Sequence, residues 1–339
     1  MFNFKNDYNY ICHENILKAL LKYQNEANEV YGLDTHSENA KRLIRKHLCN
    51  ESVDIHLIVG GTLVNKTVIS HILRPYEAVI CADTGHINVH ETGAIESTGH
   101  KVVTVKNYNG KIKKEDIKKC IQIHTDEHMV LPKIVYISES TETGTVYDRD
   151  ELKELYNFCH ENNLYLFIDG ARLGVALATG LISLEDLTKY SDVFYIGGAK
   201  TGAFLGEAVV IVNDNLKENF RFSIKQNGGM YSKGFVAGIQ FEELFKDDLF
   251  ISLGKNANTC TKYLYDELVK RGFDMQQDCV TNQIFPIVSN QVYEKLKRIV
   301  SFELWEDRGE NKVIRLVCGF KTKKEEITLF IRELDSILN

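Results

Sequence analysis

The chain has 339 residues, 44% hydrophobic and 26% charged, an ordinary globular composition that excludes a disordered or collagenous protein. Its 41 Lys and Arg residues against 47 Asp and Glu give a net charge of -6, so no basic field exists to attract nucleic acid or an anionic membrane. The eight cysteines never approach a Cys-x-x-Cys spacing, and no apolar run is long enough for an export signal or a membrane span. We therefore expect a cytosolic protein without a metal site, whose partners are small molecules or further copies of itself.

Helical patterns dominate the first 50 residues, with apolar side chains at helical spacing over residues 14–28 and again over 37–48. Between residues 54 and 212 the pattern changes to short apolar runs that alternate with amphipathic helices. The expected strands cover residues 55–59, 78–81, 102–105, 134–138, 165–168, 193–196 and 208–212. Because these runs read as strands buried on both faces, the expected fold class is α/β, with a mainly parallel seven-stranded sheet and helices on both sides.

After the last of these strands the alternation stops. One long helical pattern covers residues 235–271, and a compact strand-and-helix module follows over residues 283–338. No repeat or low-complexity linker separates the parts. We predict a large ligand-binding domain of residues 50–235 and a smaller α/β domain that combines residues 1–49 with 236–339. The boundary near residue 235 is expected to lie inside a continuous helix.

Polar segments follow three of the expected strands, at the sheet edge where open α/β folds bind ligands. The first is Gly60-Gly61-Thr62, whose glycines, helix N-terminus and hydroxyl suit a phosphate. Taken alone, Gly61 and Thr62 are better explained as an ordinary strand-to-helix turn with a capping threonine. The second is Asp169-Gly170-Ala171-Arg172, for which a helix cap and a surface ion pair are the structural alternative.

The third segment holds Lys200 among the small residues of 197–203. A buried lysine with a lowered pKa can form a Schiff base, whereas an exposed loop lysine is the simpler alternative. An anion cradle, an acid at a strand end and an amine after the next strand together meet the needs of pyridoxal phosphate. Its phosphate would be held, its pyridine nitrogen kept protonated and its aldehyde captured.

Two stretches, residues 166–172 and 195–200, resemble the threonine aldolase branch of the pyridoxal-phosphate-dependent β-eliminating lyases. These enzymes share the aspartate aminotransferase fold, fold type I. The resemblance implies that Lys200 forms the Schiff base, that Asp169 partners the pyridine nitrogen and that Arg172 binds the substrate carboxylate.

Further roles rest on the same resemblance. Within residues 85–94, His86 would stack on the cofactor ring, although His86 and His90 can equally line one helix face. Arg315 resembles a second carboxylate-binding arginine; without the family match, an outward-facing arginine on an alternating strand is the simpler account. Tyr31 resembles a tyrosine that lines the active site, part of which comes from the neighbouring subunit. A homodimer or homotetramer is therefore implied.

The sequence departs from the family pattern in two places. Ala199 stands where a Ser or Thr hydroxyl usually helps to hold the phosphate, so phosphate binding is expected to rest on Gly61, Thr62 and Lys225, the last reaching across a dimer interface. Glu142 stands where many of these aldolases carry a histidine proposed to act as acid, base or hydroxyl-binding group. Glu142 is then a candidate catalytic base, with Lys200 or a bound water as alternatives.

The implied reaction is the cleavage of a β-hydroxy-α-amino acid, L-threonine or allo-threonine, to glycine and acetaldehyde. The same lysine, aspartate and arginine set also serves β-elimination and other reactions of amino acids. An alternative of a different class is a phosphate-metabolite binder with the same sheet and no Schiff base.

Overall fold

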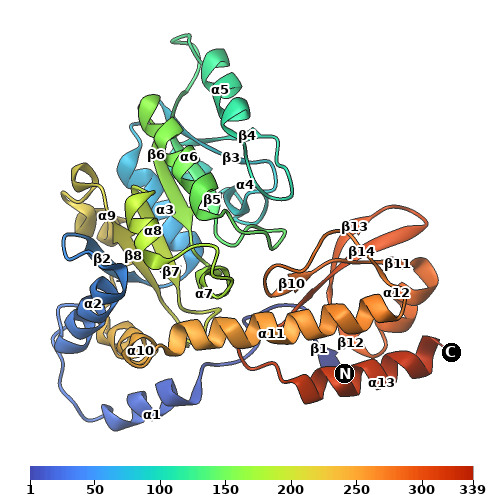
Figure 1. Cartoon of the computed structure of the whole chain (residues 1–339). Helices are drawn as coiled ribbons and strands as arrows, with labels where there is room; N and C mark the ends of the chain where they lie inside the picture. The colour runs from blue at the N-terminus through green and yellow to red at the C-terminus, as the bar shows by residue number, and fades with distance from the viewer. Residues whose placement is uncertain (339) are drawn as a thin grey trace.

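The computed structural model describes residues 1–338 and shows a large α/β part and a smaller C-terminal module (Figure 1). The large sheet has seven strands in the order β2-β8-β7-β6-β5-β3-β4. Their bounds are β2 (Asp54–Ile58), β3 (Glu77–Ala82), β4 (Lys101–Val105), β5 (Leu131–Ser138), β6 (Tyr165–Asp169), β7 (Val193–Gly197) and β8 (Glu207–Ile211). Only β8 runs antiparallel to its neighbours, so the expected fold class is confirmed.

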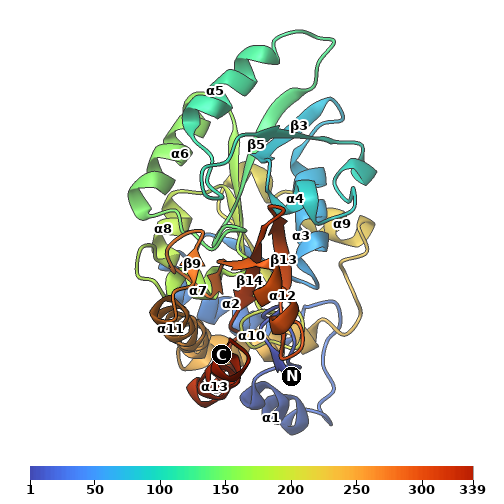
Figure 2. The same ribbon diagram turned by 90° about the vertical axis from the view of Figure 1, so that its right-hand side faces the viewer.

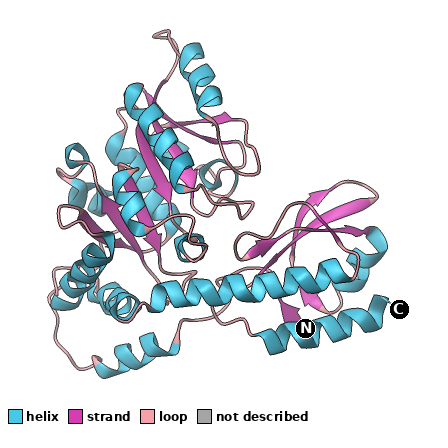
Figure 3. Ribbon diagram, viewed as in Figure 1, coloured by secondary structure: helices cyan, strands magenta, loops and turns pink. Residues whose placement is uncertain are grey.

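The inner strands are mostly apolar because helices cover the sheet on both faces (Figure 3). On β7, Phe194 and Ile196 enter one core, whereas Val193 and Tyr195 enter the other. The first core is covered by α5 (Lys114–Ile123), α6 (Arg149–Glu161), α7 (Leu173–Leu177) and α8 (Leu184–Lys189). The second is covered by α3 (Gly61–Ile72), α4 (His86–Val89) and α9 (Phe220–Gln226).

The N-terminal helices do not join the C-terminal module, contrary to the expected small domain. Both α1 (Glu14–Lys22) and α2 (Thr35–Leu48) pack against α10 (Phe235–Lys246), and Ile16 and Ile44 belong to the first core of the large sheet. Only the start of the chain reaches the module, where β1 (Phe2–Asn3) pairs with β12 (Val300–Ser301). Helix α1 also ends at Lys22 rather than at residue 28.

The helical pattern of residues 235–271 forms two helices, not one. Asp247 and Asp248 separate α10 from α11 (Leu249–Lys270), and Asp248 takes a left-handed φ of 55°, which cannot continue a right-handed helix. Along α11, Leu253 still packs in the core of the large sheet, whereas Cys260 packs in the core of the C-terminal module. Helix α11 therefore spans both parts, as Figure 1 shows, and the change between cores falls within it rather than near residue 235.

The C-terminal module is a small antiparallel sheet backed by helices. Its strands are β9 (Asp274–Met275), β10 (Gln283–Ile284), β11 (Pro286–Ser289), β13 (Glu303–Asp307) and β14 (Asn311–Val317), and its helices are α12 (Asn290–Leu296) and α13 (Lys324–Leu338). Figure 2 looks onto the molecule from the side of this module, so that β13 and β14 lie in front of the large part, and it shows both chain termini at the module.

Candidate active site

A cavity of about 840 Å³ lies where the carboxyl ends of the large sheet's strands face the C-terminal module. The large part contributes residues that directly follow strands, among them Thr62, His86, Glu142, Arg172 and Lys200. The module contributes Arg315 from β14 and four residues of β13, and the N-terminal segment adds Tyr8. A volume of this size suits a cofactor together with a small substrate. The topology thus gathers residues that are far apart in the sequence into one site.

Lys200 lies in the loop after β7, with its Nζ atom 5.8 Å from the centre of the Tyr8 ring. Burial and the charge of Arg172 lower the pKa of the Lys200 amine, which makes the neutral, nucleophilic form more accessible. Beneath this loop, buried Glu207 accepts a hydrogen bond from the Gly198 N–H at 2.9 Å. Burial raises the pKa of Glu207 to about 8, so this carboxyl is largely protonated at neutral pH.

Asp169 ends strand β6 and is only 3% exposed. Its Oδ2 accepts hydrogen bonds from the Tyr136 hydroxyl at 2.5 Å and the Asn65 amide at 3.0 Å. Its Oδ1 accepts from the Tyr195 hydroxyl at 2.5 Å and the Ala171 N–H at 2.9 Å. Burial by itself would raise the pKa of Asp169, but a neighbouring histidine charge and these hydroxyl donors hold it below its usual value. At neutral pH Asp169 is therefore an ionised carboxylate.

His86 begins α4 and is connected to Asp169 by hydrogen bonds. Its Nδ1 donates to the buried Glu91 carboxylate at 2.9 Å, and the Asn65 amide donates to the same oxygen at 2.8 Å. Asn65 thus bridges Glu91 and Asp169. This arrangement fixes the plane of the His86 ring, whose side chain is one-third exposed and lines the cavity.

Glu142 is buried beside His86. Its Oε1 accepts hydrogen bonds from the Ser138 hydroxyl at 2.6 Å and from the backbone N–H of His86 at 3.0 Å. Burial raises the pKa of the Glu142 carboxyl. A small adjoining cavity is lined by His86, Glu142, Asp169 and Lys200, so these four groups surround one space. A carboxyl with a raised pKa in such a place can take up a proton and release it again.

The two arginines differ in how far their donors are used. Arg172 forms a two-point ion pair with buried Asp7, from Nε to Oδ2 at 2.8 Å and from Nη2 to Oδ1 at 3.1 Å. Within residues 1–338, Arg315 donates one long hydrogen bond, from Nη1 to Gln283 at 3.5 Å, and its buried Nε has no partner. The Arg315 guanidinium lies 5.5 Å from the centre of the Trp305 ring. Its unused donors make Arg315 the freer anion-binding group.

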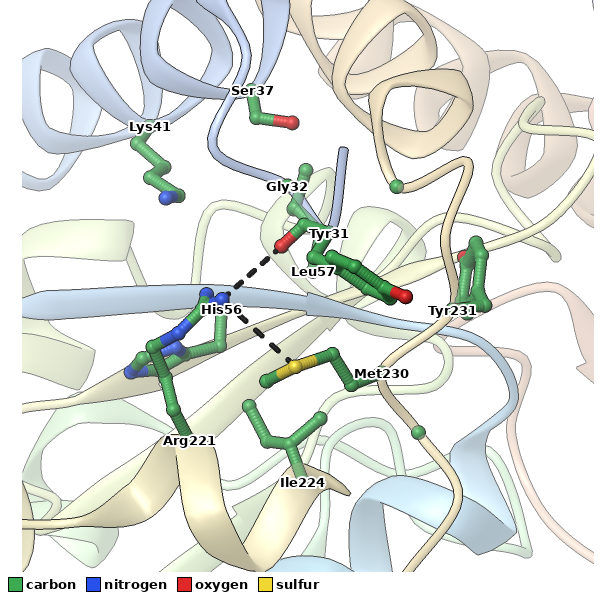
Figure 4. Close-up of a pocket in the computed structure, with 12 residues that line it drawn as sticks. Tyr31, Gly32, Ser37, Lys41, His56, Leu57, Arg221, Ile224, Met230 and Tyr231 are labelled. Carbon is green, nitrogen blue, oxygen red and sulfur yellow. Dashed lines mark hydrogen bonds between the residues drawn. The ribbon is translucent and has the colours of Figure 1, made fainter. Parts of the chain in front are cut away.

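Not every predicted site residue reaches this cavity. Gly61 begins α3 beside Thr62, and a Cβ there would lie 2.9 Å from the Tyr195 hydroxyl, so only glycine fits without rearrangement. Tyr31 and Lys225 lie together elsewhere, with the Lys225 Nζ 5.3 Å from the centre of the Tyr31 ring. Figure 4 shows Tyr31 in a separate pocket, where Arg221 donates to its carbonyl oxygen at 3.3 Å. Neither residue lines the cavity of Lys200 in the same chain.

Sequence reasoning missed several residues that support the site. Tyr136 and Tyr195 lie inside apolar strands and look like ordinary core residues. Asn65 carries a detectable signal, because it is a polar side chain among the buried apolar residues of α3. The sequence carries no local signal for Asp7, because its partner Arg172 is 165 residues away along the chain.

The comparisons with known proteins agree with this geometry. Over residues 15–291 the sequence matches the beta-eliminating lyase family. The chain belongs to that family. The low specificity L-threonine aldolase of Pseudomonas aeruginosa is 29% identical over 339 residues, which cover 98% of this chain and 96% of that protein. The corresponding Escherichia coli (strain K12) protein is 24% identical and covers 88% of each chain.

Solved structures extend the likeness. A threonine aldolase from Leishmania major superposes with a TM-score of 0.98 at 40% identity over the whole of both chains. Aspartate aminotransferase from Thermus thermophilus reaches a TM-score of 0.73 at 13% identity, which supports the fold alone. The predicted resemblance to the threonine aldolase branch is therefore confirmed, and the protein is an enzyme of a pyridoxal-phosphate-dependent lyase family.

The residues present fit that cofactor. Asp169 offers a buried carboxylate for a protonated pyridine nitrogen, and Lys200 offers an amine of lowered pKa in the same space. Across residues 1–338 there is no helix that is both long and apolar enough to cross a membrane. The same residues contain no group of three or more His, Cys, Asp or Glu placed to hold a metal ion.

Proposed function

We propose that this protein binds pyridoxal 5'-phosphate and cleaves L-threonine or L-allo-threonine to glycine and acetaldehyde. The observation that carries the proposal is the convergence of Lys200, Asp169, Glu142 and Arg315 on one cavity and its small extension. The names of the similar proteins from Pseudomonas aeruginosa and Leishmania major support the choice of substrate.

Three side chains and one helix N-terminus of the large part would hold the cofactor. Lys200 would carry it as a Schiff base, Asp169 would hold its pyridine nitrogen, and the His86 ring would lie against its face. The start of α3, with Gly61 and Thr62, would hold its phosphate. Bound in this way, pyridoxal phosphate supplies an electron sink for the pair released when a bond at the substrate Cα breaks.

The remaining chemistry belongs to the chain's own side chains. Arg315 and Arg172 bind the substrate carboxylate and so orient the Cα–Cβ bond. Glu142 accepts the proton of the β-hydroxyl as that bond breaks and acetaldehyde leaves. Burial raises the pKa of Glu142, which brings it closer to neutral pH than that of an exposed carboxylate and suits a group that must take up and release a proton. The glycine Cα then receives one proton, which balances the reaction.

A second copy of the chain is part of the proposal. Tyr31 and Lys225 lie away from their own Lys200, and the nearby apolar residues Leu33 and Phe222 are exposed. A homodimer, or a homotetramer built from such dimers, would cover this surface and bring Lys225 to the partner's phosphate site. All eight cysteines are free thiols, which supports the cytosol as the working compartment.

The test is a reconstitution with pyridoxal phosphate followed by a product assay. We expect a yellow protein whose visible band is abolished by borohydride, and release of glycine and acetaldehyde from L-threonine. The variant Lys200→Ala should show neither. Ammonia and a keto acid without glycine would identify a β-eliminating lyase instead, and a protein that stays colourless would favour a binder of phosphate metabolites.

A further inference from the structure

Asp7 occupies an unusual place for a residue so close to the N-terminus. It is 2% exposed, and its two oxygens receive the Nε and Nη2 donors of Arg172. A third donor, the Asn282 amide, reaches its Oδ2 at 2.9 Å. Burial acts to raise the pKa of the Asp7 carboxyl, but the charges of Arg172 and Lys200 and the hydrogen bonds from Arg172 and Asn282 hold it well below its usual range. Asp7 is therefore ionised at neutral pH.

This ion pair also connects the two parts of the molecule. Phe4 packs in the core of the C-terminal module, and its carbonyl accepts from the Val317 N–H at 2.8 Å, which anchors the segment to β14. Asn282 belongs to the same module and is hydrogen-bonded to Cys318. Arg172, by contrast, follows β6 of the large sheet. The Asp7–Arg172 pair therefore holds the module's edge against the catalytic face of the sheet.

Asp7 accepts hydrogen bonds from Nε and Nη2 of Arg172, the pair of donors that could otherwise bind a substrate carboxylate. A guanidinium binds a carboxylate most strongly through two parallel N–H groups on one edge. On Arg172 the Nε–Nη2 edge is already filled, so the side that remains for substrate is the Nη1 side. Arg315 also lines the cavity, and its Nε has no hydrogen-bond partner among residues 1–338.

Charge balance points the same way. Arg172 and Arg315 bring two positive charges to one cavity, and Lys200 adds a third when its amine is protonated. The charge of Arg172 acts to lower the pKa of both Lys200 and Arg315, whereas Asp7 acts in the opposite direction on each. Asp7 is thus the counter-ion of this cationic cluster.

We propose that Asp7 is a positioning residue for amino-acid recognition. It holds the Nε–Nη2 edge of Arg172, so that only the Nη1 side of Arg172 faces the substrate. The two-point contact with the substrate carboxylate is then made by Arg315. This inference rests on the proposed function, since it assumes that an α-amino acid enters the cavity. Asp7 itself touches neither substrate nor cofactor.

The test compares the Asp7→Asn holoenzyme with the wild type. Glycine is the probe, because it carries the amine and carboxylate but no β-hydroxyl. We expect its dissociation constant, followed by the visible absorbance of the holoenzyme, to rise about tenfold or more because the guanidinium is no longer fixed. The KM for L-threonine should rise in parallel, while kcat and the affinity for pyridoxal phosphate change by less than about threefold.

Three further variants make the result decisive. Asp307→Asn removes an exposed carboxylate of the same module, paired with Lys312, and should leave glycine affinity unchanged. In an Arg172→Gln background, Asp7→Asn should have no added effect, because its partner is already lost. Asp7→Glu keeps the charge and guards against a folding defect; it should bind glycine better than Asp7→Asn.

Two outcomes would overturn the proposal: glycine affinity unchanged in Asp7→Asn, or the same loss with and without Arg172. A wild-type enzyme that binds glycine but yields no acetaldehyde contradicts the proposed reaction only, and the glycine affinities still decide the role of Asp7.

Discussion

At the residue scale, Glu142 is the group whose ionisation should control the rate. As the base it must be ionised, and burial raises its pKa above the ordinary value of 4.5. The value of kcat/KM should therefore fall as the pH drops through this raised pKa, at a higher pH than for an exposed carboxylate. Replacing Glu142 by Gln should lower kcat about 10²- to 10⁴-fold and abolish this acid limb. A pH profile of L-threonine cleavage measures both effects.

The matched control is Glu154→Gln, an exposed carboxyl on α6 paired with Lys114, which should keep the wild-type profile. If Glu142→Gln retained the acid limb at the same pH, the base would have to be Lys200 or a water molecule.

Residues at strand ends were predictable, and residues that support them were not. Asp169 and Lys200 could be singled out because they follow apolar strands, at the sheet edge where open α/β folds bind ligands. The hydroxyl of Tyr136 could not, because a tyrosine in a buried strand satisfies the apolar pattern whether or not its hydroxyl binds a carboxylate. Asp7 depends on a contact 165 residues away, which no local pattern contains.

At the element scale, all seven strands of the large sheet could be located. The inner strands, buried on both faces, leave nearly continuous apolar runs, and the edge strands β2 and β4 still carry short runs of apolar and β-branched residues. The direction of β8 could not be predicted, since a buried antiparallel strand has the same composition as a parallel one. The break at Asp248 was also missed, because the apolar side chains of α10 and α11 keep nearly the same period on both sides of it.

Helix α11 depends on a close approach to α7 at Gly254. A Cβ at this position would lie 2.1 Å from the Gly174 carbonyl oxygen, and backbone cannot move aside as a flexible side chain can. Gly254→Ala gains about 1 kcal/mol of helix propensity, but overpacking costs about 1–3 kcal/mol or more. We expect a net loss of stability, measured as a melting temperature several degrees below that of the wild type.

The neighbouring exposed position gives the control for this substitution. Lys255→Ala changes helix propensity without touching α7 and should leave the melting temperature nearly unchanged. A Gly254→Ala protein as stable as Lys255→Ala would show that α7 and α11 separate at little cost.

At the scale of the whole molecule, the site lies between two parts whose cores are separate but share one helix. The large sheet supplies the residues for cofactor chemistry, whereas the module supplies Arg315 and the N-terminal segment supplies Asp7. The change of pattern after the last strand predicted two domains, but it could not show that α1 and α2 pack on the large part. Whether the apolar faces of these helices pack on the large part or on the C-terminal module depends on the three-dimensional arrangement of the chain.

We expect the exposed surface around Tyr31 to form the contact between two copies of the chain. Phe222 on α9 is 76% exposed. Exposure of so large an apolar side chain to water is unfavourable, and apolar patches of this kind often mark an interface with another protein. If a second copy covers it, Phe222→Glu should shift the wild-type dimer or tetramer toward monomer in analytical ultracentrifugation. Ile123→Glu, at the exposed end of α5, should not. Unchanged sedimentation of Phe222→Glu would place the interface elsewhere.

The same assembly can be tested through the site itself. In a dimer with shared sites, Lys200→Ala and Lys225→Ala damage different halves of each site, and both homodimers should be weakened. Mixing the two variants creates heterodimers in which one site has both lysines intact. With random exchange, half of the dimers are hybrid and half of their sites are complete, so activity should recover to about a quarter of the wild-type value. If Lys225 acted only within its own chain, the mixture would show no recovery above the mean of the two variants.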